Sequence, residues 1–449
     1  MSRQNKPEPR GACSPTPKTG SGSARPGRDF FLLWTGAGAT TVGAMVAGIA
    51  YPLLVLWLTG SAAKAGLVGF AAALPNFLVQ LPAGVLVDRV SRRRLMMACN
   101  VVGVLATGSV AVAVALGRVW LPQLMAVAFV EGSLAIVYRL AERAAVRHVV
   151  TTEQLGSALT RNEARSRAAG LLGQPLGTVL FTLTRWVPFA AAVLGHLVSM
   201  VTLWRVRGDL RDPAGDRHPG GLLGQIGEGL AWTWRQRFLR MAMSLVAGTN
   251  IVFQGVTLAL FLLLRQEHRP ATLVGLVTAC AGLGGLAGAM TASLWLRRLR
   301  LPVLLVGGML GWTVLIAAIA VVRNPLLLCL VFAAMALVGG VFNVAGGVYQ
   351  VRITPDRLQG RVSATLTLIG SGANALGMLA GGFVLDWLGV GGTALGMAGV
   401  MALLALVALA SRVVRGGGYA HAEPDAHAGP EAPAAPADPA VVTADIATA

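Results

Sequence analysis

Long apolar segments separated by short polar intervals make up most of this chain of 449 residues. Only 12% of the residues are charged, against about 25% in an average soluble domain. Most of the segments have the roughly 17–25 residues that a helix needs to cross a bilayer, or more. The chain is therefore expected to be an all-α integral membrane protein, which excludes a soluble domain and a disordered chain. We count twelve such segments, at about 30–58, 65–86, 95–116, 121–143, 160–183, 187–205, 238–263, 271–294, 301–322, 326–350, 362–385 and 392–412.

Basic residues are distributed unevenly between the intervals. The chain has 37 Lys and Arg against 19 Asp and Glu, a formal charge of +18. Most of these basic residues fall in every second interval, as with Arg92–Arg94 and Arg297–Arg300, while the other intervals hold isolated ones. Loops rich in Lys and Arg stay in the cytoplasm, so both termini are expected there. Because the basic residues lie in short clusters between apolar segments, nucleic-acid binding is not expected. The tails at 1–28 and 415–449 are rich in Pro, Ala, Gly or Ser and are expected to be disordered.

The chain divides into two related halves. A long interval at 206–236 separates a first half at 29–205 from a second at 237–414, and residues 222–239 have the pattern of an interfacial amphipathic helix. The stretch Gly173–Gly177 in segment five matches Gly377–Gly381 in segment eleven. Related halves of this kind place a substrate site near the middle of the membrane, between the two bundles.

The interval between segments two and three contains a recognisable motif. Gly84 is followed by Asp88 and Arg89 and then by the basic residues Arg92–Arg94. This pattern resembles the loop motif of the major facilitator superfamily. The resemblance implies twelve transmembrane helices in two six-helix bundles related by pseudo-two-fold symmetry, in which Asp88 helps to latch the halves on the cytoplasmic side. The alternative is a solvated basic loop that only fixes topology.

Other stretches resemble bacterial drug and natural-product efflux members of this superfamily, in the group of macrolide effluxers and siderophore exporters. They lie around Glu142 and Arg143 and at Arg361. A glycine and proline pattern in segment five is similar to that of proton-coupled antiporters, with the proline one place late; its alternative role is close helix packing. We therefore expect a cytoplasmic gate at Gly84, Asp88, Arg89, Glu142, Arg143 and Arg361, and a helix-packing motif at Gly170, Gly173, Pro175 and Gly177.

One acidic residue lies deep in an apolar segment. Glu131 is near the middle of segment four, and a carboxyl at that depth is a candidate for proton coupling. A structural carboxylate, paired with an arginine or closer to the outer interface, is the alternative. Polar residues on the segments that line the cavity in this superfamily are candidates for substrate contacts or for hydrogen bonds between helices. They are Thr41, Asn250, Gln254 and Asn343, joined by Glu131.

The function expected from these features is secondary active transport. A cavity with little charge suits lipophilic or amphipathic small molecules, exported by alternating access in exchange for protons. The expected partners are this substrate, protons and the lipid bilayer of the cell membrane, and the protein is expected to be a monomer. No enzyme motif, catalytic residue, cofactor or metal site is expected. The alternatives are transport of another cargo, such as a siderophore, in either direction, and a membrane scaffold or receptor that transports nothing.

Overall fold

The structure is a computed structural model that describes residues 27–207, 234, 236–354 and 358–411, and these residues form helices and no strand. The helices of the first half are α1 (Arg28–Thr59), α2 (Ala62–Ala73), α3 (Pro75–Leu78), α4 (Gln80–Arg89), α5 (Arg92–Ala115), α6 (Leu121–Val149), α7 (Thr152–Leu183) and α8 (Val187–Arg205). Those of the second half are α10 (Arg237–Gln266), α11 (Thr272–Arg298), α12 (Leu301–Ile319), α13 (Pro325–Ile353) and α14 (Gln359–Ala410). The tails and most of the expected amphipathic helix lie outside the described residues.

Local sequence explains where these helices begin and end. The helices α6, α8, α12 and α13 each have a proline in the first turn, where its missing N–H group leaves no hydrogen bond unmade. Gly60 ends α1 in the left-handed conformation, at φ 75°. Ser61 then starts α2, because its hydroxyl accepts a hydrogen bond from the Lys64 N–H.

Nine described helices are long and apolar enough to cross a membrane, and the number is ten if the pair Ala62–Leu78 and Pro82–Arg89, bent by 60°, is one span. The expected second segment is thus a broken helix, α2 to α4, and not a straight one. The expected segments eleven and twelve are two arms of α14, which breaks at Gly389, where φ is 66°. The twelve segments are complete if α7, which is less apolar than the others, and the second arm of α14 also cross the membrane.

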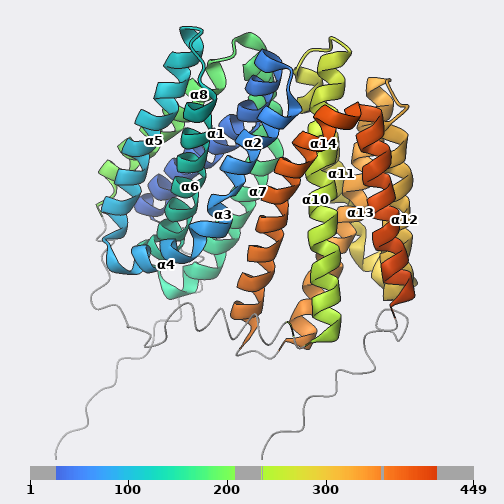
Figure 1. Ribbon diagram of the computed structural model, residues 1–449. Helices are drawn as coiled ribbons and strands as arrows, with labels where there is room; N and C mark the ends of the chain where they lie inside the picture. Colours follow the sequence, from blue (N-terminus) through green and yellow to red (C-terminus); the bar gives the residue numbers. More distant parts are fainter. Residues whose placement is uncertain (1–26, 208–233, 235, 355–357, 412–449) are drawn as a thin grey trace, which may run out of the picture.

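The two halves repeat the same packing. In the first half α1 packs against α7 and α8, α5 against α6 and α8, and α2 against α6. In the second, α10 packs against α14, α12 against α13 and α14, and α11 against α13. The halves stand side by side in Figure 1. They are joined mainly by the packing of α2 against α14 and of α7 against α11, and these two contacts are equivalent under the repeat.

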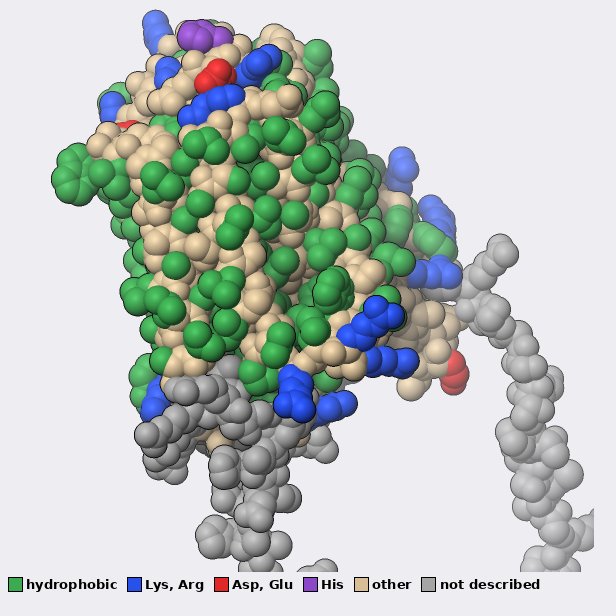
Figure 2. All heavy atoms as spheres, turned by 90° about the vertical axis from the view of Figure 1, so that its right-hand side faces the viewer, with side chains coloured by type: hydrophobic (Ala, Val, Ile, Leu, Met, Phe, Trp, Pro, Cys, Tyr) green, Lys and Arg blue, Asp and Glu red, His purple; other side chains and the backbone are tan. Residues whose placement is uncertain are grey.

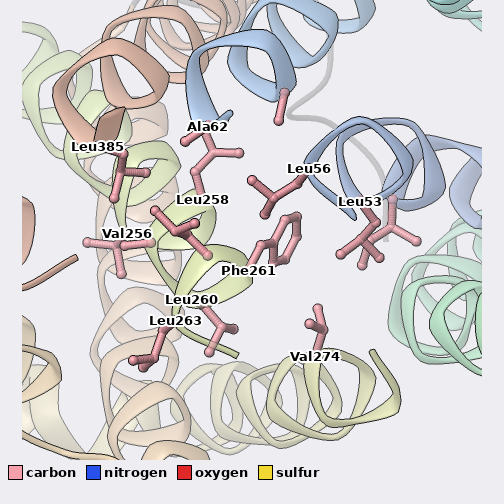
Figure 3. Close-up of a cluster of buried hydrophobic side chains, with 14 of the residues drawn as sticks. Leu53, Leu56, Ala62, Val256, Leu258, Leu260, Phe261, Leu263, Val274 and Leu385 are labelled. Carbon is pink, nitrogen blue, oxygen red and sulfur yellow. The ribbon is translucent and has the colours of Figure 1, made fainter. Parts of the chain in front are cut away.

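The halves share an apolar core at one end of the molecule. We call the end where α1 and α14 begin the basic end, because Arg28, Arg92–Arg94, Arg147, Arg205, Arg297 and Arg298 lie there, and the other the opposite end. Near the opposite end, Leu53 and Leu56 of α1 lie in one buried cluster with Phe261 of α10 and Val274 of α11 (Figure 3). Near the basic end the described residues form separate clusters, one around Met96 and Ile136 and one around Ala292. The structure is therefore closed at the opposite end.

The sides of the molecule are apolar. Figure 2 shows a wide band of hydrophobic side chains on the face formed by α12, α13 and the second arm of α14, with Lys and Arg gathered toward its two ends. Val314 and Leu330, for example, are 69% and 65% exposed. Exposed apolar side chains in such a band are those that lipid would cover.

Candidate functional site

Three of the expected gate residues surround one hollow at the basic end. Gly84, Asp88 and Arg143 line a pocket of about 520 Å³ together with Arg92 and His148, which contact each other. The motif lies on the end of α4 and not in a loop, since this helix continues to Arg89 and only two residues separate it from α5.

Asp88 and Arg89 are exposed and form no hydrogen bond or ion pair with the described residues. Arg361 lies near the start of α14, in the second half. The carboxylate of Asp88 is therefore available to accept a hydrogen bond.

Glu142 lies apart from this pocket in a buried ion pair. Both of its carboxylate oxygens accept from Nη2 of Arg165 in α7, at 2.7 and 3.0 Å. The Nη1 of Arg165 also donates to the backbone oxygen of Trp34, at 3.1 Å, and both charged side chains are less than 10% exposed. The pair therefore ties α6, α7 and α1 together within the first half, where the sequence suggested charges at the mouth of a gate.

Glu131 is buried in the middle of the first half. It is 7% exposed, and the hydroxyl of Thr107 in α5 donates to its Oε1. The Nε2 of His196 in α8 lies 3.4 Å from the same oxygen. Tyr51 of α1 is also close enough to interact with this carboxyl electrostatically, and its buried hydroxyl lies near Thr107.

Hydrogen bonds continue from His196 toward the basic end. Its Nδ1 lies 3.2 Å from Oδ1 of Asn100, and Nδ2 of Asn100 donates to the hydroxyl of Ser199 at 2.9 Å. The hydroxyl of Tyr138 lies 2.8 Å from that of Ser199. These polar groups are all buried, so Glu131 belongs to a hydrogen-bonded network of α5, α6 and α8 and has no arginine partner in it.

The expected cavity residues lie in different surroundings. The hydroxyl of Thr41 donates to Ala37 in its own helix. Asn250 and Gln254 of α10 are half-buried and reach α14, where they donate to the Gly370 carbonyl at 3.5 Å and to Asn374 at 3.2 Å. Asn343 of α13 is exposed and forms no hydrogen bond with the described residues. Asn250 and Gln254 thus join two helices of the second half, and Asn343 is the one with a fully available amide.

The glycines of the segment-five motif permit close packing at two positions. A methyl group at Gly177 would lie 2.8 Å from the backbone oxygen of Val46 in α1, and Gly173 faces Met45 in the same helix. Pro175 faces Gly275 of α11 in the second half, whereas Gly170 has open space around it. The motif therefore places α7 between α1 and the other half.

A carboxylate that the sequence did not single out joins the halves at the opposite end. Asp386 of α14 accepts from the backbone N–H groups of Ala62 and Ala63, at 2.6 and 3.1 Å. It also accepts from the hydroxyl of Ser61, at 2.6 Å. The second half thus caps the start of α2 in the first half, and nothing in the local sequence around Asp386 indicates this partner.

Other missed residues left a weak signal. Asn100, Gly103 and Thr107 follow one another at the spacing of a single helix face, and this small and polar stripe in an apolar segment could have indicated the surroundings of Glu131.

Among the described residues, no group of His, Cys, Asp or Glu could hold a metal ion.

Comparison with known proteins places this arrangement in a family. The model of the transmembrane secretion effector family matches residues 26–437. The chain is 26% identical over 396 residues to the multidrug efflux pump Tap of Mycobacterium tuberculosis, covering 84% of this chain and 92% of that one.

Solved structures share the fold. The nucleoside transporter NupG matches with a TM-score of 0.66 at 14% identity, over 86% of this chain and 99% of that one. A bacterial homologue of the human lysosomal transporter Spinster, in an inward-facing and unoccupied conformation, matches with a TM-score of 0.64 at 15% identity, over 85% and 94%. At such identity the likeness concerns the fold alone. With the family match, it shows that this multi-pass membrane protein belongs to the transmembrane secretion effector family, within the major facilitator superfamily of transporters.

Proposed function

We propose that this transporter exports lipophilic or amphipathic small molecules in exchange for protons, with Glu131 as the coupling carboxyl. The observation behind this proposal is the burial of Glu131 beside a second titratable side chain, without an arginine or lysine to hold it permanently ionised. An ionisable group in the interior of a membrane protein is costly and is usually functional. The similarity to a multidrug efflux pump supports export.

The basic end faces the cytoplasm in this proposal. Arginines are concentrated there, and cytoplasmic loops retain basic residues. With the opposite end closed, the structure then corresponds to the state that would take up substrate from the cytoplasm or the inner leaflet. The exposed amide of Asn343 suits the wall of a water-filled route, because an unpaired amide facing lipid is unfavourable. No fixed charge is among the cavity candidates, which favours apolar and amphipathic substrates over phosphorylated ones.

Transport by purified protein in liposomes tests the proposal. With a lipophilic cationic dye as probe and a pH gradient as driving force, the wild-type protein is expected to move dye against its concentration gradient. The Glu131→Gln variant is expected to lose the gradient-driven part, while counterflow of dye without a gradient persists. Glu163→Gln is the matched control, since Glu163 is exposed and pairs with Arg167 on the surface of its own helix.

Two results would contradict the proposal. Full proton-driven transport by Glu131→Gln would remove Glu131 from the coupling step. If the wild-type protein moved neither dyes nor siderophores under any gradient, a scaffold or receptor role would replace transport.

A further inference from the structure

The imidazole of His196 and the carboxyl of Glu131 form a buried pair. Their side chains are 8% and 9% exposed, and the two facing atoms are 3.4 Å apart. Among the described residues, Tyr51 from α1 is a further titratable group that interacts electrostatically with Glu131. The α5 helix contributes the hydroxyl of Thr107 and the amide of Asn100, which are not titratable. The net charge of the pair therefore depends on how many protons His196 and Glu131 hold between them.

The hydrogen bonds around His196 determine which ring nitrogen holds a proton and which one can accept a hydrogen bond from Glu131. Because the amide nitrogen of Asn100 donates to Ser199, its oxygen faces Nδ1 of His196. An oxygen acceptor there requires a proton on Nδ1. In the neutral imidazole, Nε2 then has a lone pair and faces Oε1 of Glu131.

This arrangement is satisfied when the pair holds one proton. A protonated Glu131 can donate to neutral His196, or a carboxylate can accept from the protonated imidazole. With no proton, two acceptors would face each other in a buried site; with both groups protonated, two donors would do so, and either state is costly without solvent. One proton can pass from the carboxyl oxygen to Nε2 and back without any other group changing its protonation.

Neighbouring residues provide space for the imidazole and a spare donor for the carboxylate. A methyl group at Gly103 would lie 2.5 Å from two atoms of the His196 ring, so the imidazole fits only because this residue is glycine. The hydroxyl of Tyr51, buried near Thr107 and Glu131, is a further donor close to the carboxylate when the proton has moved to His196.

The pair also lies away from the contact between the halves. Its groups come from α1, α5, α6 and α8, whereas the halves meet mainly through α2, α7, α11 and α14. We propose that His196 is the second proton-holding residue of the transporter, and that it shares one transported proton with Glu131 inside the first half. The α1 helix connects this pair to the rest of the molecule, since Tyr51 faces Glu131 while Leu53 and Leu56 pack near α10 and α11. This inference depends on the proposed function.

The test compares His196→Gln with Glu131→Gln in liposomes, and His268→Gln is the control because it makes the same change at an exposed position. Counterflow without a gradient, which needs no net proton movement, is expected in all three variants. Proton-driven transport by His196→Gln is expected to be largely lost, and the pH dependence of what remains to flatten. The infrared band of the protonated Glu131 carboxyl, assigned by its loss in Glu131→Gln, is expected to persist at high pH, because no imidazolium then stabilises the carboxylate.

A measurement on the unaltered side chains covers the case in which His196→Gln fails to fold. In wild-type protein with nitrogen-15 histidine, the imidazole signal of His196 is expected to change its protonation state when the Glu131 carboxyl band disappears. A wild-type pH profile in His196→Gln, when Glu131→Gln has lost coupling, would overturn the role of His196 and leave that of Glu131 intact. An imidazole signal that does not follow the carboxyl band would overturn it as well. Full coupling in both variants would remove both proposals.

Discussion

The carboxylate of Asp386 is expected to hold the opposite end of the molecule closed. It belongs to the second half and receives hydrogen bonds from two backbone N–H groups and one hydroxyl at the start of α2, in the first half. The start of a helix has N–H groups without partners inside the helix and a partial positive charge. Asp386 therefore stabilises α2 only while the two halves are in contact at this end, and the Asp386→Ala substitution removes that stabilisation from the closed state alone.

The size of the effect follows from this geometry. Loss of a side-chain cap costs about 0.5–2 kcal/mol, and a charge near an exposed helix start contributes about 0.3–1 kcal/mol. The two contributions overlap at Asp386, which is exposed, so we expect Asp386→Ala to cost the closed state about 1–2 kcal/mol. This corresponds to roughly a 5- to 30-fold change in the ratio of closed to open molecules. Asp386→Asn keeps an acceptor oxygen and loses the charge, so its effect is about 0.3–1 kcal/mol.

Distances between spin labels at Arg118 and Val321 measure this ratio. Both positions are exposed at the opposite end. Arg118 lies between α5 and α6 of the first half, and Val321 lies between α12 and α13 of the second half. A larger population of long distances is expected in Asp386→Ala, and a smaller increase in Asp386→Asn. Glu267→Ala is the matched control, because Glu267 is at the same end and pairs with Arg323 within the second half. A distance distribution in Asp386→Ala identical to that of the wild type would refute the reasoning.

Three further substitutions test other contacts. Glu142→Gln leaves Arg165 buried without its counter-charge, and is expected to lower the free energy of unfolding by about 3–5 kcal/mol; thermal unfolding in detergent measures this, and replacement of both residues by apolar ones should recover much of the loss. Gly103→Ala places a methyl group 2.5 Å from the His196 ring; it is expected to displace the imidazole and to reduce proton-driven transport more than counterflow. Gly66→Ala places a methyl group 2.5 Å from a backbone oxygen of α14; such overpacking costs about 1–3 kcal/mol and is expected to open the opposite end in the same spin-label measurement, whereas an unchanged distribution would show that the halves are not in close contact there.

The sequence was sufficient to predict what depends on local composition. Apolar length predicted the helices, and the spacing from Gly84 to Arg94 predicted the superfamily, which the family and fold comparisons confirm. Depth alone singled out Glu131, and the structure does bury it. The same reasoning gave segment two only as one apolar segment at about 65–86, because hydropathy does not register the bend that divides it into α2, α3 and α4.

Partners distant in the chain could not be predicted. Thr107 and His196 meet Glu131 from two other helices. The stripe of Asn100, Gly103 and Thr107 marks one face of its helix, but it does not indicate which residues of other helices that face meets. The contact between Asp386 and the start of α2 depends on how the two halves stand against each other. A local sequence pattern does not describe how the halves are placed, so it could not indicate this contact.

The contact between α2 and α14 links Asp386 to the motif at the basic end. The α2–α4 segment runs from the opposite end to the basic end and has Asp88 near its end, while the first arm of α14 runs the other way and has Asp386 near its end. Each acid therefore lies at the end of the molecule where the neighbouring helix of the other half begins. In this structure Asp386 accepts a hydrogen bond from the start of α2, whereas Asp88 forms no hydrogen bond with the described residues. Both observations agree with closure at the opposite end.

If closure at the basic end brings Asp88 to the start of α14, the two carboxylates stabilise opposite states. Asp88→Ala should then shift the spin-label distances toward the closed opposite end, contrary to Asp386→Ala, and a shift of both in one direction would mean that Asp88 is not a latch.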